Sequence, residues 1–318
     1  MKILTSLLIM IVLLFSAFIG KVDIHLHALL DMHSIDSTIF YQLRLPRVIL
    51  AFLAGGILAL SGLIFQTLFR NPLTTPFTLG ISSGATLGAA TAIIFGYHSS
   101  FMGFSAISLF AFLGALFTVG LIYYFSKQLS STTDHRLILV GIALSFFFSS
   151  LLLILYYVSD FEESYLIMRF TMGALDTVGY SAIIPLLFAT FLILFVAYKF
   201  SEELRLLSIS YEFAYLRGVN VDVVMLSMFV AISLAVGALV SITGPIGFVG
   251  LIIPHIIKLV YKKSADKLLL TSFVSGGIFL VLCDTLARAL PTVSEVPVGI
   301  ITSLIGGIIF IVILMKKE

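Results

Sequence analysis

The chain has 318 residues, of which 60% are hydrophobic and 11% are charged, and its mean hydropathy is +1.18. Soluble domains carry about 25% charged residues, so this composition excludes a water-soluble protein and predicts a polytopic membrane protein. The net charge of +2 indicates no partner by itself. The lone Cys283 excludes a disulfide framework and a cysteine metal site.

Apolar runs broken by charged or turn residues predict an all-α protein with ten transmembrane helices in one domain over 1–318. In chain order the runs lie at about 3–20, 47–66, 77–95, 103–125, 137–158, 181–198, 223–241, 246–261, 268–287 and 297–315. The first run is expected to be a retained span rather than a signal peptide. It is long for an h-region, and no A-x-A-like cleavage site follows it.

Basic residues give the orientation. With the N-terminus inside, thirteen Lys and Arg residues fall on the cytoplasmic side, and the five outside are Lys21, Arg44, Arg47, Arg169 and Arg288. This bias agrees with the positive-inside rule, so we expect both termini to be cytoplasmic.

Residue patterns for catalysis are missing from the sequence. It contains no H-E-x-x-H, no G-x-S-x-G and no G-x-x-x-x-G-K-[ST] phosphate loop. The chain is therefore expected to be no enzyme and to hold no cofactor. Any ATP-driven work would be done by a partner that binds the ATP.

Asp284 is the one carboxylate well inside a predicted span, and it has two interpretations. An acid within the membrane is a candidate proton relay, but Arg288 four residues later lies on the same helix face. We favour the structural ion pair, because a relay needs further buried ionisable groups.

Histidines raise the question of a metal site. His255 follows Pro254 in an apolar run, where a packing role is the more common one. A predicted outside segment carries imidazoles and carboxylates at a short spacing that suits a transition-metal site. These residues are Asp23, His25, His27, Asp31 and His33. The same pattern equally suits a connector that faces water. We predict no metal site at either place.

The segment 201–222 is the longest cytoplasmic loop, and its charges keep it out of lipid. Its leucines predict surface helices with an apolar face suited to a protein partner. Ser210 can cap a short helix, Glu212 then lies in its first turn, and Gly218 suits a left-handed residue after its end.

Small residues recur at spacings of three or four, and such faces let membrane helices approach closely. They form three groups: Gly55, Ala59 and Gly62; Gly80, Gly84 and Gly88; Gly244, Gly247 and Gly250. We expect them to pack helices together.

Seven sequence blocks carry a family resemblance: Arg44-Leu45-Pro46-Arg47, Ala59-Leu60-Ser61-Gly62, Leu68-Phe69-Arg70-Asn71-Pro72-Leu73, Leu79-Gly80-Ile81-Ser82-Ser83-Gly84-Ala85, Gly244-Pro245-Ile246-Gly247-Phe248-Val249-Gly250-Leu251-Ile252-Ile253-Pro254-His255, Ala287-Arg288 and Val296-Pro297-Val298-Gly299-Ile300-Ile301-Thr302. With these blocks the chain resembles the permease family of ABC importers for iron–siderophore complexes, haem and vitamin B12. The blocks span nearly the whole chain. The resemblance implies ten spans with cytoplasmic termini, which agrees with the charge count, in the cytoplasmic (inner) membrane of a bacterium or archaeon.

The resemblance also implies the partners. They are a second permease copy, two cytoplasmic ATP-binding subunits, an extracytoplasmic substrate-binding protein and the lipid bilayer, with no nucleic acid. Alternating access would move an iron–siderophore, haem, cobalamin or similar metal chelate inward. The competing class is an ATP-independent secondary transporter or channel, which would be expected to show several buried ionisable residues.

Residues that match the family's positions fall into three groups. Those implied to dock the binding protein, through an outward-facing basic patch, are Arg44, Arg47 and Arg288. Those implied to couple to the ATPase are Glu212, Ala214 and Gly218. Those implied to form the inner gate are Asn71, Leu73, Asp134 and His135.

Two departures from the family pattern stand out. Asp134 and His135 occupy a loop where relatives carry small hydroxyl residues, so an Asp–His gate and a simple helix start are both open. Tyr211 begins the coupling segment, where relatives tend to have a small residue.

Overall fold

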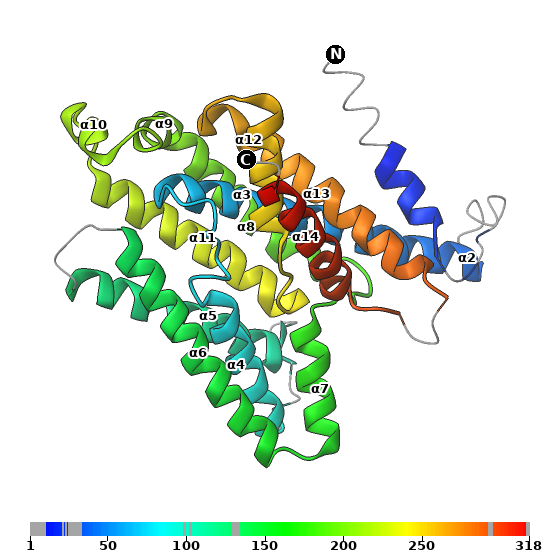
Figure 1. Ribbon diagram of the computed structural model, residues 1–318. Coiled ribbons are helices and arrows are strands. Elements are labelled where there is room, and N and C mark those ends of the chain that lie inside the picture. The colour runs from blue at the N-terminus through cyan, green and yellow to red at the C-terminus, as the bar shows by residue number, and fades with distance from the viewer. Residues whose placement is uncertain are drawn as a thin grey trace.

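The protein is described by a computed structural model over residues 11–20, 22, 24, 34–97, 100–101, 104–128, 134–291 and 295–315. It is built almost wholly from helices (Figure 1). Residues 11–18 are helical, and a two-residue antiparallel pair joins β1 (Ser100–Phe101) to β2 (Phe104–Ser105). The remaining elements are α2 (Ile35–Thr38), the π-helix η2 (Ile39–Arg44), α3 (Leu45–Leu68), α4 (Ile81–Ile94), α5 (Ala106–Gln128), α6 (Asp134–Val158), α7 (Phe161–Met172), α8 (Ile183–Lys199), α9 (Ser201–Leu207), α10 (Tyr211–Leu216), α11 (Val221–Thr243), α12 (Val249–Tyr261), α13 (Ala265–Ala289) and α14 (Val298–Met315).

Each of the ten predicted apolar runs contains a helix. Within the described residues, five helices are long and apolar enough to cross a membrane, and α8 with α9, bent by 64°, makes a sixth if the pair is one span. Three further apolar helices are shorter: α4, α12 and residues 298–313 of α14. These findings confirm a polytopic helical membrane protein, while ten crossings and cytoplasmic termini stay predictions.

The helix α7 has no counterpart among the predicted elements. Its apolar residues are interrupted by Glu162, Glu163 and Arg169, so it gives no apolar run. The side chain of Asp160 accepts a hydrogen bond from the backbone of Glu163, whose side chain accepts one from the backbone of Asp160 in return. This capping box was readable from the D-x-x-E spacing.

Helix α3 lies at the centre of the bundle. Nearly all of its residues are buried, as expected for a helix that is apolar on every side. It packs most extensively against α13 and also against α12, α8 and α11. Helix α6, by contrast, leaves most of its apolar surface exposed, as a helix facing lipid or another subunit does.

Most of the small residues sit where backbones approach closely, as the sequence predicted, whereas a Cβ atom added to Gly247 would meet only the hydroxyl oxygen of Ser303, at 3.7 Å. A Cβ atom added to Gly55 would lie 2.2 Å from the carbonyl oxygen of Gly276 on α13, and one added to Gly62 would lie 1.8 Å from that of Gly250 on α12. Helices α4 and α5 meet in the same way, at Gly84 and Gly114. Only glycine permits these approaches.

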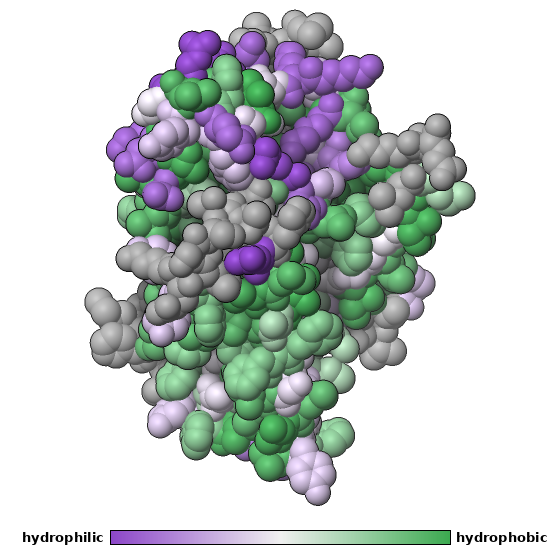
Figure 2. Space-filling view, turned by 60° about the vertical axis from the view of Figure 1, so that its left-hand side comes forward, coloured by the Kyte–Doolittle hydropathy of each residue, from purple (hydrophilic) through white to green (hydrophobic). Residues whose placement is uncertain are grey.

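Hydrophilic residues gather toward one end of the molecule, and hydrophobic residues cover most of the rest of the face shown in Figure 2. The short helices α9 and α10 lie at that end (Figure 1). This polarity is what a membrane protein with one charged, water-facing end shows.

The contact between α3 and α12 generates a stability prediction. Gly62→Ala adds one methyl group against the Gly250 carbonyl and should lower the free energy of unfolding by about 1–3 kcal/mol, the usual cost of overpacking. Thermal unfolding in detergent measures it. The control Gly120→Ala, where a new Cβ meets nothing within 4 Å, should leave stability unchanged or slightly raised. Equal melting temperatures for the two variants would contradict the assignment.

Candidate functional site

The segment 201–222 folds into α9 and α10, as predicted. The hydroxyl oxygen of Ser210 accepts a hydrogen bond from the backbone N–H of Phe213 at 2.9 Å and so caps the start of α10. At the other end, Gly218 has a φ of +79°. The N–H of Val219 donates to the carbonyl of Ala214, and that of Gly218 to the carbonyl of Tyr215. This is a complete Schellman cap, which confirms the predicted roles of Ser210 and Gly218 in the local fold.

The two faces of this segment differ. Leu204, Leu207 and Ala214 are buried against the bundle. The exposed side carries three large apolar side chains together with the charged Glu212: Ile209, Tyr215 and Leu216. A capped helix with exposed apolar residues at the charged end of the molecule is a surface suited to a protein partner. Of the three residues implied to couple, Glu212 and Gly218 are accessible and Ala214 is not.

Glu212 has an unusually favourable site for its charge. A hydrogen bond from its own backbone N–H, one from Ser210 and the nearby charge of Arg70 lower the pKa of its carboxyl group. Because the carboxylate lies in the first turn of α10, it also faces the positive end of the helix dipole.

The loop that follows α3 carries two of the predicted gate residues. The side-chain oxygen of Asn71 accepts a hydrogen bond from the N–H of Leu73 at 2.9 Å, which fixes a tight turn, and the Leu73 side chain is half exposed. Asp134 begins α6, in agreement with the helix-start interpretation. The side chains of Asp134 and His135 lie outside the described residues, so their role at a gate stays a prediction.

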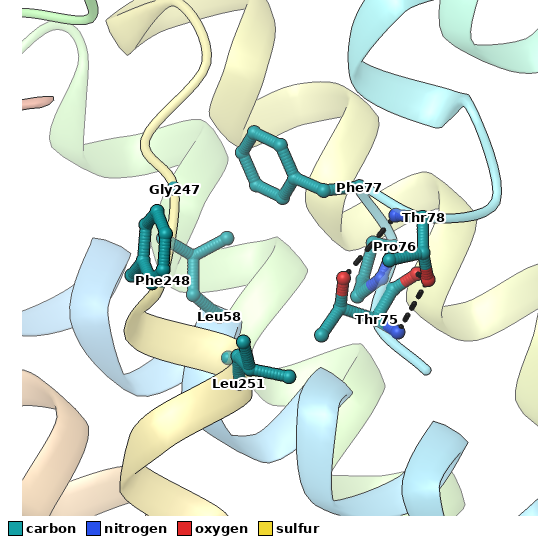
Figure 3. A pocket seen from close by; sticks show the side chains of 9 residues that line it. Leu58, Thr75, Pro76, Phe77, Thr78, Gly247, Phe248 and Leu251 are labelled. Carbon is teal, nitrogen blue, oxygen red and sulfur yellow. Dashed lines mark hydrogen bonds between the residues drawn. The ribbon is translucent and has the colours of Figure 1, made fainter. Parts of the chain in front are cut away.

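Two hollows adjoin one another beside this loop. The first, shown in Figure 3, lies between the loop and the start of α12. The first encloses about 200 Å³. Thr75 and Thr78 exchange hydrogen bonds between backbone N–H groups and hydroxyl oxygens, at 2.9 and 3.2 Å, which holds Phe77 at the rim. Across the hollow, Phe248 has a left-handed backbone with φ +67°. Leu58, Pro76, Gly247, Gly250 and Leu251 complete the lining.

The second hollow shares Phe77 and Gly247 with the first and reaches α7 and α14. Its other lining residues are Thr171, Met172, Pro245, Gly299, Ile300, Ser303 and Leu304. Every residue lining either hollow is uncharged. Phe77 and the two threonines were not predicted as site residues, because no motif marks a hollow built from segments distant in the chain.

Asp284 lies at the centre of a buried ion cluster. Its carboxylate accepts hydrogen bonds from Arg288 at 2.9 Å and from Arg47 at 2.9 Å. Arg47 also pairs with Glu295, which is 41% exposed. The structural pair of Asp284 with Arg288 is confirmed, and the spacing of four residues was the signal. Arg47 and Glu295 were not expected in it.

Arg288 of this cluster and the nearby Arg44 hold the end of the first helix, residues 11–18. Arg288 donates to the backbone carbonyls of Ser16 and Ile19, at 3.1 and 2.7 Å. Arg44 donates to the carbonyls of Phe18, at 2.7 Å, and Val22. The carbonyls of Ser16 and Phe18 lie in the last turn of this helix, where carbonyls lack partners within the helix, so cations at this end are favourable.

The predicted outward-facing basic patch is therefore not what the structure shows. Arg44 and Arg288 are only 7% and 3% exposed, and Arg47 is mostly buried. Their hydrogen bonds point inward, to Asp284 and to the first helix, because buried guanidinium groups need partners. Docking on these residues stays a prediction.

The histidine candidates give no metal centre in the described residues, where no group of three or more His, Cys, Asp or Glu side chains comes together. His255 is buried in α12. Asp23, His25, His27, Asp31 and His33 lie outside the described residues.

The ion cluster generates a second stability prediction. Asp284→Asn leaves Arg288 without its buried counter-charge and should lower the free energy of unfolding by about 3–5 kcal/mol. The control Asp176→Asn breaks the exposed pair with Arg169, which should cost about 0–1 kcal/mol. Thermal unfolding of both variants measures the difference. A proton relay would instead show unchanged stability in Asp284→Asn with transport lost.

Comparisons with known proteins agree with one another. The FecCD transport family matches residues 8–316. The hemin transport system permease protein HmuU of Yersinia pestis is 33% identical over 98% of this chain and 94% of its own length. The molybdate import system permease protein MolB of Haemophilus influenzae is 34% identical over 91% of this chain and 84% of its own length.

A solved structure shows the same fold. It is described as an inward-facing conformation of an ABC transporter of the metal-chelate type. It is 33% identical, covers 99% of both chains and has a TM-score of 0.86. These matches decide between the two transporter classes that the sequence left open, in favour of an ABC importer permease. The chain belongs to the FecCD transport family, whose members are the membrane-spanning permeases of ABC importers.

Proposed function

We propose that this chain imports a metal chelate as the permease of a complex with two cytoplasmic ATP-binding subunits and an extracytoplasmic binding protein. The permease is proposed to act as a homodimer. The observation that carries the proposal is the coupling segment, because a rigidly capped helix with exposed apolar residues at the charged end suits an ATPase groove.

The cargo is proposed to be an iron–siderophore, haem, cobalamin or similar chelate. The loop that follows α3, residues 69–80, is here called the inner loop. The two hollows between the inner loop, α7, α12 and α14 support this cargo, because their lining is uncharged and largely apolar. Such walls suit an organic ligand shell. A small free oxyanion favours cationic and N–H donors, which these walls do not supply through side chains.

The membrane topology is proposed to be ten crossings with both termini in the cytoplasm, in a bacterial or archaeal inner membrane. Five long helices, α8, three shorter apolar helices and residues 11–18 make up the ten, and α9, bent by 64° from α8, lies in the coupling segment at the cytoplasmic end. Helices shorter than a full span are tolerated where other helices shield them, and α4 and α12 pack closely against α5 and α3.

This topology predicts which side each loop faces. A membrane-impermeant maleimide should label Ser208→Cys only from the cytoplasmic side and Glu162→Cys only from the outer side. Both positions are exposed, whereas the native Cys283 is buried and serves as the unlabelled background. Labelling of both sites from the same side would contradict the topology.

At the inner end, we assign the gate to Asn71, Leu73, Asp134 and His135. The turn made by Asn71 and the exposed side chain of Leu73 support this at the first loop. At the outer end, docking of the binding protein is proposed at Arg44, Arg47 and Arg288, and the pair of Arg47 with Glu295, which reaches the surface, is the part of this region that a partner can contact.

The coupling role is tested at Gly218. Placing a β-branched residue in a left-handed backbone conformation costs about 1–2 kcal/mol of conformational free energy. Gly218→Val should therefore disrupt the cap at the end of α10 and displace that end. The purified complex should still hydrolyse ATP, but stimulation by the loaded binding protein should fall by about five- to thirtyfold, the factor that this energy represents.

Gly218→Asn is the matched control, because asparagine tolerates the left-handed region, and it should retain most of the stimulation. Full stimulation in Gly218→Val would remove the coupling assignment. If no ATPase subunit co-purifies with the parent chain, the proposed function itself fails.

A further inference from the structure

The first residue of α10 is in contact with the end of α3. The phenolic hydroxyl of Tyr211 donates a hydrogen bond to the backbone carbonyl of Leu68, the last residue of α3. The guanidinium carbon of Arg70 lies 4.6 Å from the centre of the Tyr211 ring, within the range of a cation–π interaction. The two contacts tie Tyr211 to both sides of the point where α3 ends.

The Leu68 carbonyl and Arg70 are both well placed to hold Tyr211 in a fixed position. The Leu68 carbonyl belongs to the last turn of α3, where carbonyls lack partners within the helix. Arg70 has a left-handed backbone with φ +46° and lies at the start of the inner loop. Tyr211 directly follows the cap Ser210, and α10 is closed at both ends. A displacement of α10 therefore carries Tyr211 with it.

The inner loop continues the connection. After Arg70, the Asn71 turn presents Leu73, and the loop reaches the paired Thr75 and Thr78 beside the first hollow. A single stretch of about ten residues thus runs from the contact with α10 to the wall of that hollow.

We propose that Tyr211 is a positioning residue that transmits the displacement of α10 by the ATPase subunits to the inner loop at Arg70–Leu73. This inference rests on the proposed function and adds a defined route from the coupling segment to the gate. It also gives a role to the departure at Tyr211, because a small residue has no side chain to reach Leu68 or Arg70.

The test follows the loop itself, without any cargo. The complex with its ATPase subunits carries Leu73→Cys, and a charged maleimide measures the labelling rate of that thiol without nucleotide and with ATP and vanadate. The rate should change with nucleotide in the parent. Tyr211→Ala and Arg70→Gln should reduce that change by about fivefold or more, the lower range of ordinary coupling between sites.

Two further variants separate transmission from folding. Tyr211→Phe removes only the hydroxyl donor and should give an intermediate reduction. Tyr198→Phe, at the inner end of α8, removes a hydroxyl outside the contact and should leave the nucleotide response unchanged. The amount of ATPase subunit that co-purifies should be the same for all variants.

Three outcomes would overturn the inference. They are a full nucleotide response in Tyr211→Ala, no response at Leu73 in the parent, and loss of the ATPase subunit from both Tyr211→Phe and Arg70→Gln, which would make the contact a purely structural one. A parent chain that binds no ATPase subunit would instead refute the proposed function.

Discussion

The close contact of helix backbones at glycine is the constraint on which the bundle depends. Inside a membrane, apolar side chains gain little by meeting one another, because lipid tails are equally apolar. Helices must associate through tight packing, and α3 does so at Gly55 and Gly62, where its backbone meets α13 and α12. With α3 fixed between these two helices, the positions of its N-terminal and C-terminal ends are also fixed, and both ends carry polar contacts.

The two ends of α3 are held by different chemistry. At its N-terminal end, Arg47 joins the buried cluster around Asp284, and Arg44 and Arg288 nearby hold the first helix. At its C-terminal end, Gln66 donates to the carbonyls of Gly250 and Leu251 on α12 at 3.2 Å. Tyr211 donates a hydrogen bond to the carbonyl of Leu68, the last residue of the helix. The first end is thus held by a buried ion pair, whereas the second is joined to α12 and, through Tyr211, to the segment proposed to meet the ATPase.

Much of the fold was predictable from the sequence, because it depends on local patterns. Apolar runs predicted the helices, small residues predicted the helix contacts, and the caps at Ser210 and Gly218 followed from residue type and spacing. The pair of Asp284 with Arg288 followed from helix periodicity. Helix α7 was missed because it is short and carries charges, although its capping box was visible.

The rest depends on contacts between distant segments, which a single sequence does not reveal. Arg47 meets Asp284 across 237 residues, and Tyr211 meets Leu68 across 143. Arg44, Arg47 and Arg288 were expected to face outward because they match the positions at which the family is implied to dock the binding protein. Their side chains turn inward because an acid and the unpaired carbonyls of the first helix lie within reach.

The helices are held together by backbone contacts at glycine, whereas the hollows are lined by side chains. This difference determines which parts of such a permease can change during evolution. At Gly62 the neighbouring atom is a backbone oxygen, so no compensating substitution on the partner helix can make room. Phe77 and Leu304 stand at the wall of a hollow, where a new side chain changes only the surface that a cargo would meet. A lineage built on this plan can therefore change what it carries while its scaffold stays the same, and relatives one-third identical to this chain bear the names of cargoes as different as hemin and molybdate.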